Sequence, residues 1–112
     1  MARRPDPETH AELKDFLDAL GRRFKPLRAV LFGSRARGTH LRSSDFDLLL
    51  ISEAFVGVPF RDRIKDASLD WDGEWRLDVL CYSPEELERK RAQIGVVAEA
   101  LVHGIELEVP SQ

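Results

Sequence analysis

Two aspartates, Asp45 and Asp47, stand at the start of the apolar segment 46–51. Side chains two residues apart on a strand share one face and lie about 6–7 Å from each other along it. Two carboxylates held that close repel by ~3 kcal/mol at an effective dielectric constant near 20, and a divalent cation between them reverses the sign of this energy. The pair therefore indicates an oxygen-only Mg²⁺ site, although two solvent-facing acids at a strand start would have the same spacing.

A glycine-serine pair, Gly33-Ser34, directly follows an expected strand at 27–32. Glycine lets the backbone approach a ligand closely or take a positive φ, and successive N–H groups in such a turn form a nest for anions. The hydroxyl of Ser34 adds a neutral donor, and Arg35 and Arg37 add cations that can pair with phosphate. Alone, these residues fit an ordinary turn with surface arginines. Together with the two acids that follow, they predict a pocket shared by Mg²⁺ and a nucleoside triphosphate.

A third acid, Asp78, lies one residue inside the expected strand at 77–82. A charge inside a strand is costly unless it is paired or bound to a metal. If this strand lies beside the one that starts at Asp45, Asp78 can face the same metal; the alternative is a salt bridge to Arg76 or to a helix arginine. The predicted catalytic and metal-binding residues are Asp45, Asp47 and Asp78, and the predicted nucleotide-binding residues are Gly33, Ser34, Arg35 and Arg37.

The rest of the chain predicts helices alternating with strands in a single domain, 1–112, with its core at about 13–109. Short connections between such elements favour a compact sheet with helices packed on it. The segment 83–86, serine-proline-glutamate-glutamate, is a strong helix start. Helices are expected at 7–23, 60–69 and 84–103, the last with a candidate break at Gly95, and strands at 27–32, 46–51, 77–82 and 105–109.

Composition excludes several classes of protein. The 112 residues carry a net charge of −3, which argues against a globally basic nucleic-acid surface. A single cysteine, Cys81, cannot form an internal disulfide and is expected in the core. No apolar run is long enough for a transmembrane helix or a signal peptide. We expect a cytoplasmic protein that has no membrane partner and does not bind nucleic acid directly.

One spaced motif of this sequence resembles the polymerase-β-like nucleotidyltransferase superfamily. The motif is the glycine-serine pair, ten intervening residues and then Asp45-Phe46-Asp47, with Asp78 on a later strand. The segment 32–38 is more narrowly similar to the minimal nucleotidyltransferases, which are commonly encoded beside a helical HEPN-domain partner. The loop at 39–42 departs from the family, whose members often have more polar and acidic residues there.

This resemblance extends over about 13–109 and implies an α+β fold with a mixed sheet and packed helices. It implies that Asp45 and Asp47 hold two Mg²⁺ ions, that Asp78 completes one metal site, and that Gly33 and Ser34 hold the triphosphate of ATP. It also implies an antitoxin that transfers AMP from ATP to a tyrosine hydroxyl of a HEPN toxin.

Two other functions are compatible with the sequence. The first is an antitoxin that neutralises its toxin by binding alone. Its candidate interface residues are aromatic, a type that is favoured at interfaces: Phe55, Phe60, Trp71 and Trp75, of which Phe60 is better explained as a core residue. The second is a transferase for a small hydroxylated substrate such as an aminoglycoside, although such enzymes usually carry an additional substrate domain.

Overall fold

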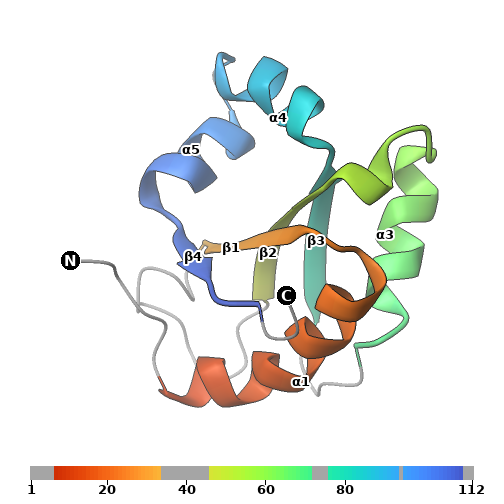
Figure 1. Ribbon diagram of the computed structural model, residues 1–112. Coiled ribbons are helices and arrows are strands. Elements are labelled where there is room, and N and C mark those ends of the chain that lie inside the picture. The colour runs from red at the N-terminus through yellow and green to blue at the C-terminus, as the bar shows by residue number, and fades with distance from the viewer. Residues whose placement is uncertain (1–6, 34–45, 72–75, 94, 110–112) are drawn as a thin grey trace.

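A four-stranded mixed sheet forms the centre of the molecule in this computed structural model, which describes residues 7–33, 46–71, 76–93 and 95–109 (Figure 1). The strand order is β3-β2-β1-β4, with β1 antiparallel to β2 and β4, and β2 parallel to β3. The strands are β1 (Leu27–Phe32), β2 (Phe46–Ser52), β3 (Leu77–Tyr82) and β4 (Ile105–Leu107). The helices are α1 (Pro7–Arg23), α3 (Phe60–Ser68), α4 (Pro84–Arg91) and α5 (Val96–His103), with a short 3-10 helix, η1, at Glu53–Phe55.

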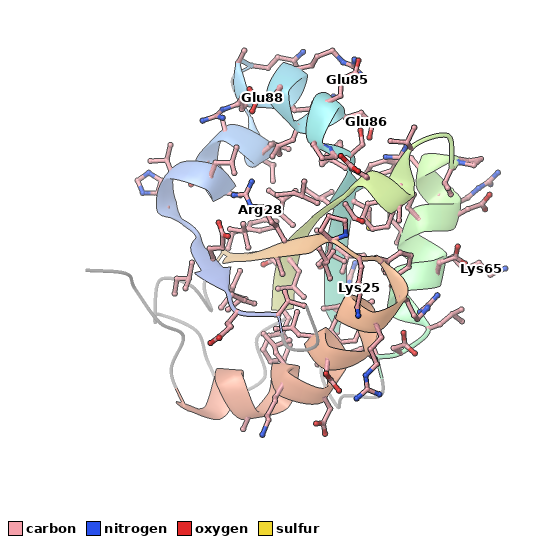
Figure 2. The ribbon with its side chains drawn as sticks, in the orientation of Figure 1. Lys25, Arg28, Lys65, Glu85, Glu86 and Glu88 are labelled. Atoms are coloured by element: carbon pink, nitrogen blue, oxygen red, sulfur yellow. The ribbon has the colours of Figure 1, made fainter. Side chains whose placement is uncertain are left out.

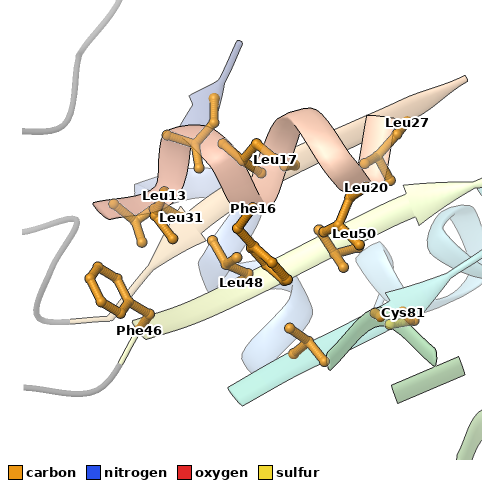
Figure 3. Packing of buried hydrophobic residues seen from close by; sticks show 14 of the residues in the cluster. Leu13, Phe16, Leu17, Leu20, Leu27, Leu31, Phe46, Leu48, Leu50 and Cys81 are labelled. Atoms are coloured by element: carbon orange, nitrogen blue, oxygen red, sulfur yellow. The ribbon is translucent and has the colours of Figure 1, made fainter. Parts of the chain in front are cut away.

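One face of the sheet packs against α1 and α3. The apolar stripe of α1 lies on alternate residues of β1 and β2 (Figure 3). The buried residues alternate along each strand because successive side chains of a strand point to opposite faces of the sheet. The fully or almost fully buried residues on this side include Leu13, Leu17, Leu20, Leu31, Phe46, Leu48 and Leu50.

The other face of the sheet packs against α4 and α5. Leu49 and Ile51 of β2 lie in a second buried cluster with Leu87 of α4 and with Val97 and Ala100 of α5. The strand β2 is therefore covered on both faces, as its nearly continuous apolar sequence predicts.

The predicted elements are confirmed with small changes at their ends. Ser83 caps α4, because its hydroxyl accepts from the N–H of Glu86 while the Glu86 side chain accepts from the N–H of Ser83. Gly95, with a φ of 155°, separates α4 from α5. The connection between the expected strand at 46–51 and the expected helix at 60–69 contains η1, and the expected last strand is shorter than 105–109.

The aromatic residues suggested as an interface differ in their exposure. Phe55 is buried at 1% exposure, so its prediction as an exposed residue is wrong. Trp71 is half-buried, with its ring centroid 5.3 Å from that of Phe16 and 5.5 Å from that of Phe46. Phe60 is 40% exposed, which contradicts its placement in the core. Trp75 lies outside the described residues.

Candidate active site

The parallel pairing of β2 with β3 brings two of the predicted acids together. Asp47 and Asp78 are direct partners in this register. Neighbouring strands lie about 4.8 Å apart, and paired residues direct their side chains to the same face. Both residues are partly exposed to solvent. The sequence predicted that Asp78 could join the other acids if its strand lay beside theirs. The pairing of β3 with β2 meets this condition.

These two side chains leave the sheet on the face that α4 and α5 cover. Asp47 alternates along β2 with Phe46 and Leu48, which lie in the cluster under α1. It shares its own face with Leu49 and Ile51 of the second cluster. The acids stand where β2 and β3 begin, at the end of the sheet from which β1 leads into Gly33.

Gly33 lies against the carboxylate of Asp47. Its φ is 75°, in the region that side chains with a Cβ rarely adopt. A Cβ built on Gly33 would overlap Oδ2 of Asp47. Phe32, the residue before it, is the register partner of Asp47 in the antiparallel pair of β1 and β2. The glycine is therefore needed twice, for its backbone conformation and for the space that the carboxylate fills.

Asp78 also forms the ion pair that the sequence offered as the alternative to metal binding. Nε of Arg76 lies 3.4 Å from Oδ1 of Asp78, with the two side chains 73% and 47% exposed. Exposed ion pairs of this kind contribute between about 0 and 1 kcal/mol to the free energy of unfolding. The pair is weak enough for a doubly charged cation to replace Arg76 as the partner of this carboxylate.

Four predicted site residues, Ser34, Arg35, Arg37 and Asp45, lie outside the described residues. Within the described ranges, no group of three or more histidine, cysteine, aspartate or glutamate side chains is arranged to hold a metal. The three-acid site therefore stays a prediction. Asp47 and Asp78 fit Mg²⁺ by their chemistry, since this ion takes one or two carboxylates together with substrate phosphates.

The nucleotidyltransferase domain model matches residues 13–109, most of the chain. The chain belongs to the nucleotidyltransferase domain family. A crystal structure from Sulfolobus solfataricus, provisionally described as a nucleotidyltransferase, has a TM-score of 0.67 and 21% sequence identity, covering 94% of this chain and 84% of that one. This likeness concerns the fold alone, and it confirms the predicted α+β nucleotidyltransferase architecture.

This nucleotidyltransferase domain also resembles part of a curated relative. The Haemophilus influenzae protein named "Probable protein adenylyltransferase MntA" is 45% identical over 52 residues. The match spans 46% of this chain and 46% of that relative, so about half of each is compared. The described part of the domain contains no helix that is both long and apolar enough to cross a bilayer.

The sequence did not predict a cavity that lies beside Gly33. Its volume is about 170 Å³, and α5 supplies much of its wall, including Glu99 and His103. These two residues belong to no spaced motif in the sequence. Their position becomes visible only when α5 packs on the sheet face that carries Asp47.

Proposed function

We propose that this domain is a Mg²⁺-dependent nucleotidyltransferase that transfers AMP from ATP to a protein hydroxyl. The observation that carries the proposal is the pairing of Asp47 with Asp78 on one sheet face, beside a glycine fitted to the Asp47 carboxylate. Membership of the family supports the reaction class. The partial match to a relative named as a protein adenylyltransferase supports a protein acceptor and AMP as the transferred group.

The chain's own residues have separate parts in this proposal. Asp47, Asp78 and Asp45 would hold Mg²⁺, which polarises the α-phosphate and stabilises the pyrophosphate leaving group. The turn that begins at Gly33 and Ser34 would bind the triphosphate, with Arg35 and Arg37 balancing its charge. Asp78, on the edge strand β3, would accept a proton from the attacking hydroxyl.

The reaction balances as a substitution at phosphorus. The oxygen of the acceptor hydroxyl forms a bond to the α-phosphorus of ATP, and the bond from that phosphorus to the oxygen bridging to the β-phosphate breaks. The products are an AMP ester of the acceptor and pyrophosphate, and the hydroxyl proton passes to Asp78 or to solvent. No oxidant or reductant is needed.

For the acceptor, we propose a tyrosine of a HEPN-domain toxin, with this domain as the antitoxin. This part rests on the resemblance of the glycine-serine and aspartate motifs to the minimal nucleotidyltransferases. An antitoxin that works by binding alone is the second candidate. It is favoured by exposed apolar side chains at the two ends of α3 and in the segment before it: Val56 is 66% exposed, Phe60 40% and Leu69 68%.

One experiment separates these proposals. The chain is incubated with Mg²⁺, ATP and the HEPN-domain protein encoded beside it, and the mass of that protein is measured. We expect a gain of one AMP, lost in Asp47→Asn and in Asp78→Asn and retained in Asp62→Asn, an acid on the exposed side of α3. If the double variant Asp47→Asn, Asp78→Asn protects cells fully against the toxin, neutralisation occurs by binding. AMP transfer only to a small hydroxylated compound would favour the small-molecule alternative.

A further inference from the structure

A cavity of about 170 Å³ opens between the end of β1 and the helix α5. It lies on the same face of the sheet as Asp47, because α5 packs on that face through Val97 and Ala100. Among the described residues, its lining includes Phe32, Gly33, Val96, Glu99, Ala100 and His103.

The cavity begins next to the proposed metal-binding carboxylate. Phe32 is the register partner of Asp47, and Gly33 lies against the Asp47 carboxylate. A phosphate held at Asp47 would therefore stand at the mouth of the cavity. In a nucleoside triphosphate, the α-phosphate is bonded to the nucleoside on one side and to the pyrophosphate on the other, so these are the two groups that could enter the cavity.

The chemistry of the walls selects between these two groups. Phe32, Val96 and Ala100 present apolar surface, and Val96 is 57% exposed. Glu99 presents a carboxylate, and none of the described lining residues is a lysine or an arginine. A pyrophosphate would be repelled by Glu99 and would bury charge against apolar groups. A nucleoside instead has flat apolar faces and N–H and O–H donors at its edges.

We propose that this cavity receives the nucleoside of the donor triphosphate, with Glu99 accepting a hydrogen bond from an N–H of the base or an O–H of the ribose. The inference rests on the proposed transferase function. The cavity volume of about 170 Å³ suits one ring of the base, with the ribose at the open mouth, since an engineered apolar cavity of about 150 Å³ takes up benzene. His103 stands one helical turn from Glu99 on the same face of α5, as residues four apart do, and supplies a second polar group at the wall.

A second cavity offers the competing location. It has a volume of about 360 Å³ and lies across Val96 from the first one, over β3, where Leu80, Tyr82 and Lys90 contribute to its lining. This cavity is on the side of Asp78, away from Gly33, since β3 and β1 flank β2 on opposite sides. Lys90 therefore provides the control for a nucleoside bound on the wrong side of the acids.

The test compares two probes that share a triphosphate but not a nucleoside. The affinities of ATP and of inorganic tripolyphosphate, each with Mg²⁺, are measured by calorimetry for the full chain and three variants. We expect Glu99→Ala to weaken ATP binding about tenfold, as the loss of a hydrogen bond to a charged group does, and to leave tripolyphosphate binding unchanged. Val102→Ala, at a residue of α5 that is 74% exposed and does not line the cavity, and Lys90→Ala should leave both affinities within about twofold.

Each other outcome overturns the inference in a recognisable way. A gain of affinity for both probes in Glu99→Ala would mean that the cavity holds phosphate, because a repelling carboxylate is removed, and an equal loss for both would mean that Glu99 acts on the phosphates or their Mg²⁺ and not on the nucleoside. No loss for either probe, or a loss of ATP affinity in Lys90→Ala instead, would place the nucleoside elsewhere while leaving the proposed function standing. A wild-type chain that binds neither probe with Mg²⁺ would overturn the proposed function and this inference together. Glu99 is exposed, so its replacement should not prevent folding, which circular dichroism checks.

Discussion

Arg63 of α3 and Glu86 of α4 form a bidentate ion pair at the end of β3. Nη1 and Nη2 of the arginine donate to the two carboxylate oxygens of Glu86 at 2.5 and 3.1 Å. Arg63 is only 6% exposed and also donates to the carbonyls of Val58 and Cys81 at 2.7 and 3.1 Å. Glu86 lies on the side of α4 towards α3, whereas Glu85 points outward (Figure 2). The pair therefore joins two helices to the strand that carries Asp78.

Removal of the Glu86 charge should destabilise the fold strongly. Glu86→Gln leaves a buried guanidinium without its counter-charge, and breaking such a pair costs about 3 kcal/mol in the free energy of unfolding. Glu85→Gln is the matched control. Among the described residues, the ion pair of Glu85 is with Arg89, and its side chain is 85% exposed. We therefore expect its free energy of unfolding to change by no more than about 0.5 kcal/mol. Urea unfolding measures both. Equal midpoints for the two variants would contradict the role of the pair.

The same ion pair should make stability depend on acid pH. The Arg63 guanidinium lowers the pKa of Glu86 from 4.5 to about 2, so the ionised form is favoured in the folded state. Its contribution is complete above the unfolded pKa near 4.5 and is lost as the pH falls towards about 2. The stability difference between the wild type and Glu86→Gln should therefore shrink across this window in urea unfolding at stepped pH. If the stability difference between the two proteins stayed constant down to pH 2, the charge of Glu86 would not be what stabilises the fold.

The contrast between Ser83 and Arg63 shows what the sequence can predict about the fold. The cap at Ser83 was predictable because all its partners lie within three residues and follow a known pattern. The burial of Arg63 was not, because its helix is polar and only loosely periodic, and its partner lies 23 residues further along the chain. Periodicity identifies which helix faces are apolar, but it carries no information about a charge that is satisfied by a distant element.

The site divides in the same way. The strands that carry Asp47 and Asp78 and the glycine at the end of β1 were predictable from the sequence pattern, and the sequence stated the condition under which Asp78 would join Asp47; the three-acid metal site stays a prediction. The register that makes Asp47 and Asp78 direct partners arises from tertiary pairing. The cavity at Glu99 depends on how α5 packs on the sheet, and single helical residues give no signal of that in the sequence.

Cys81 should be chemically inert in the folded protein. Burial raises the pKa of its thiol to about 12, against the opposing effect of the nearby Arg63 charge, so almost no thiolate forms near neutral pH. We expect alkylation by iodoacetamide at pH 8 to be at least about a hundredfold slower in the folded chain than in urea, because the thiolate is both scarce and covered. Mass spectrometry follows the modification. Rapid labelling without denaturant would contradict the buried position of this thiol.

Magnesium should stabilise the domain through the paired acids. Binding to the folded state alone at ten times the dissociation constant adds about 1.4 kcal/mol, which corresponds to a rise in Tm of roughly 4–8 °C for a chain of this size. The rise should be lost in Asp47→Asn and Asp78→Asn and kept in Asp62→Asn. Thermal unfolding with added Mg²⁺ and after chelation with EDTA measures it. A rise that survives in both site variants would place the ion elsewhere.

Two glycines with nearly the same backbone conformation allow the contact with Asp47 to be tested separately from strain. Gly33 and Gly57 have φ values of 75° and 79°, so alanine costs about 1–2 kcal/mol of backbone energy at either position. Only at Gly33 does the new Cβ meet another group, the Asp47 carboxylate, whereas nothing lies near a Cβ at Gly57.

Gly33→Ala should therefore reduce AMP transfer about a hundredfold, because a displacement of about 1 Å at a reacting group has an effect of that size. Gly57→Ala should lose stability in urea without losing transfer. The two variants are compared at a temperature where both are folded, by the rate of AMP incorporation and by their stabilisation with Mg²⁺. If both lose activity only in proportion to their stability, the fit between Gly33 and Asp47 has no part in the reaction. If Gly33→Ala alone is inactive while still folded, the Asp47 carboxylate acts from the position that the glycine makes available.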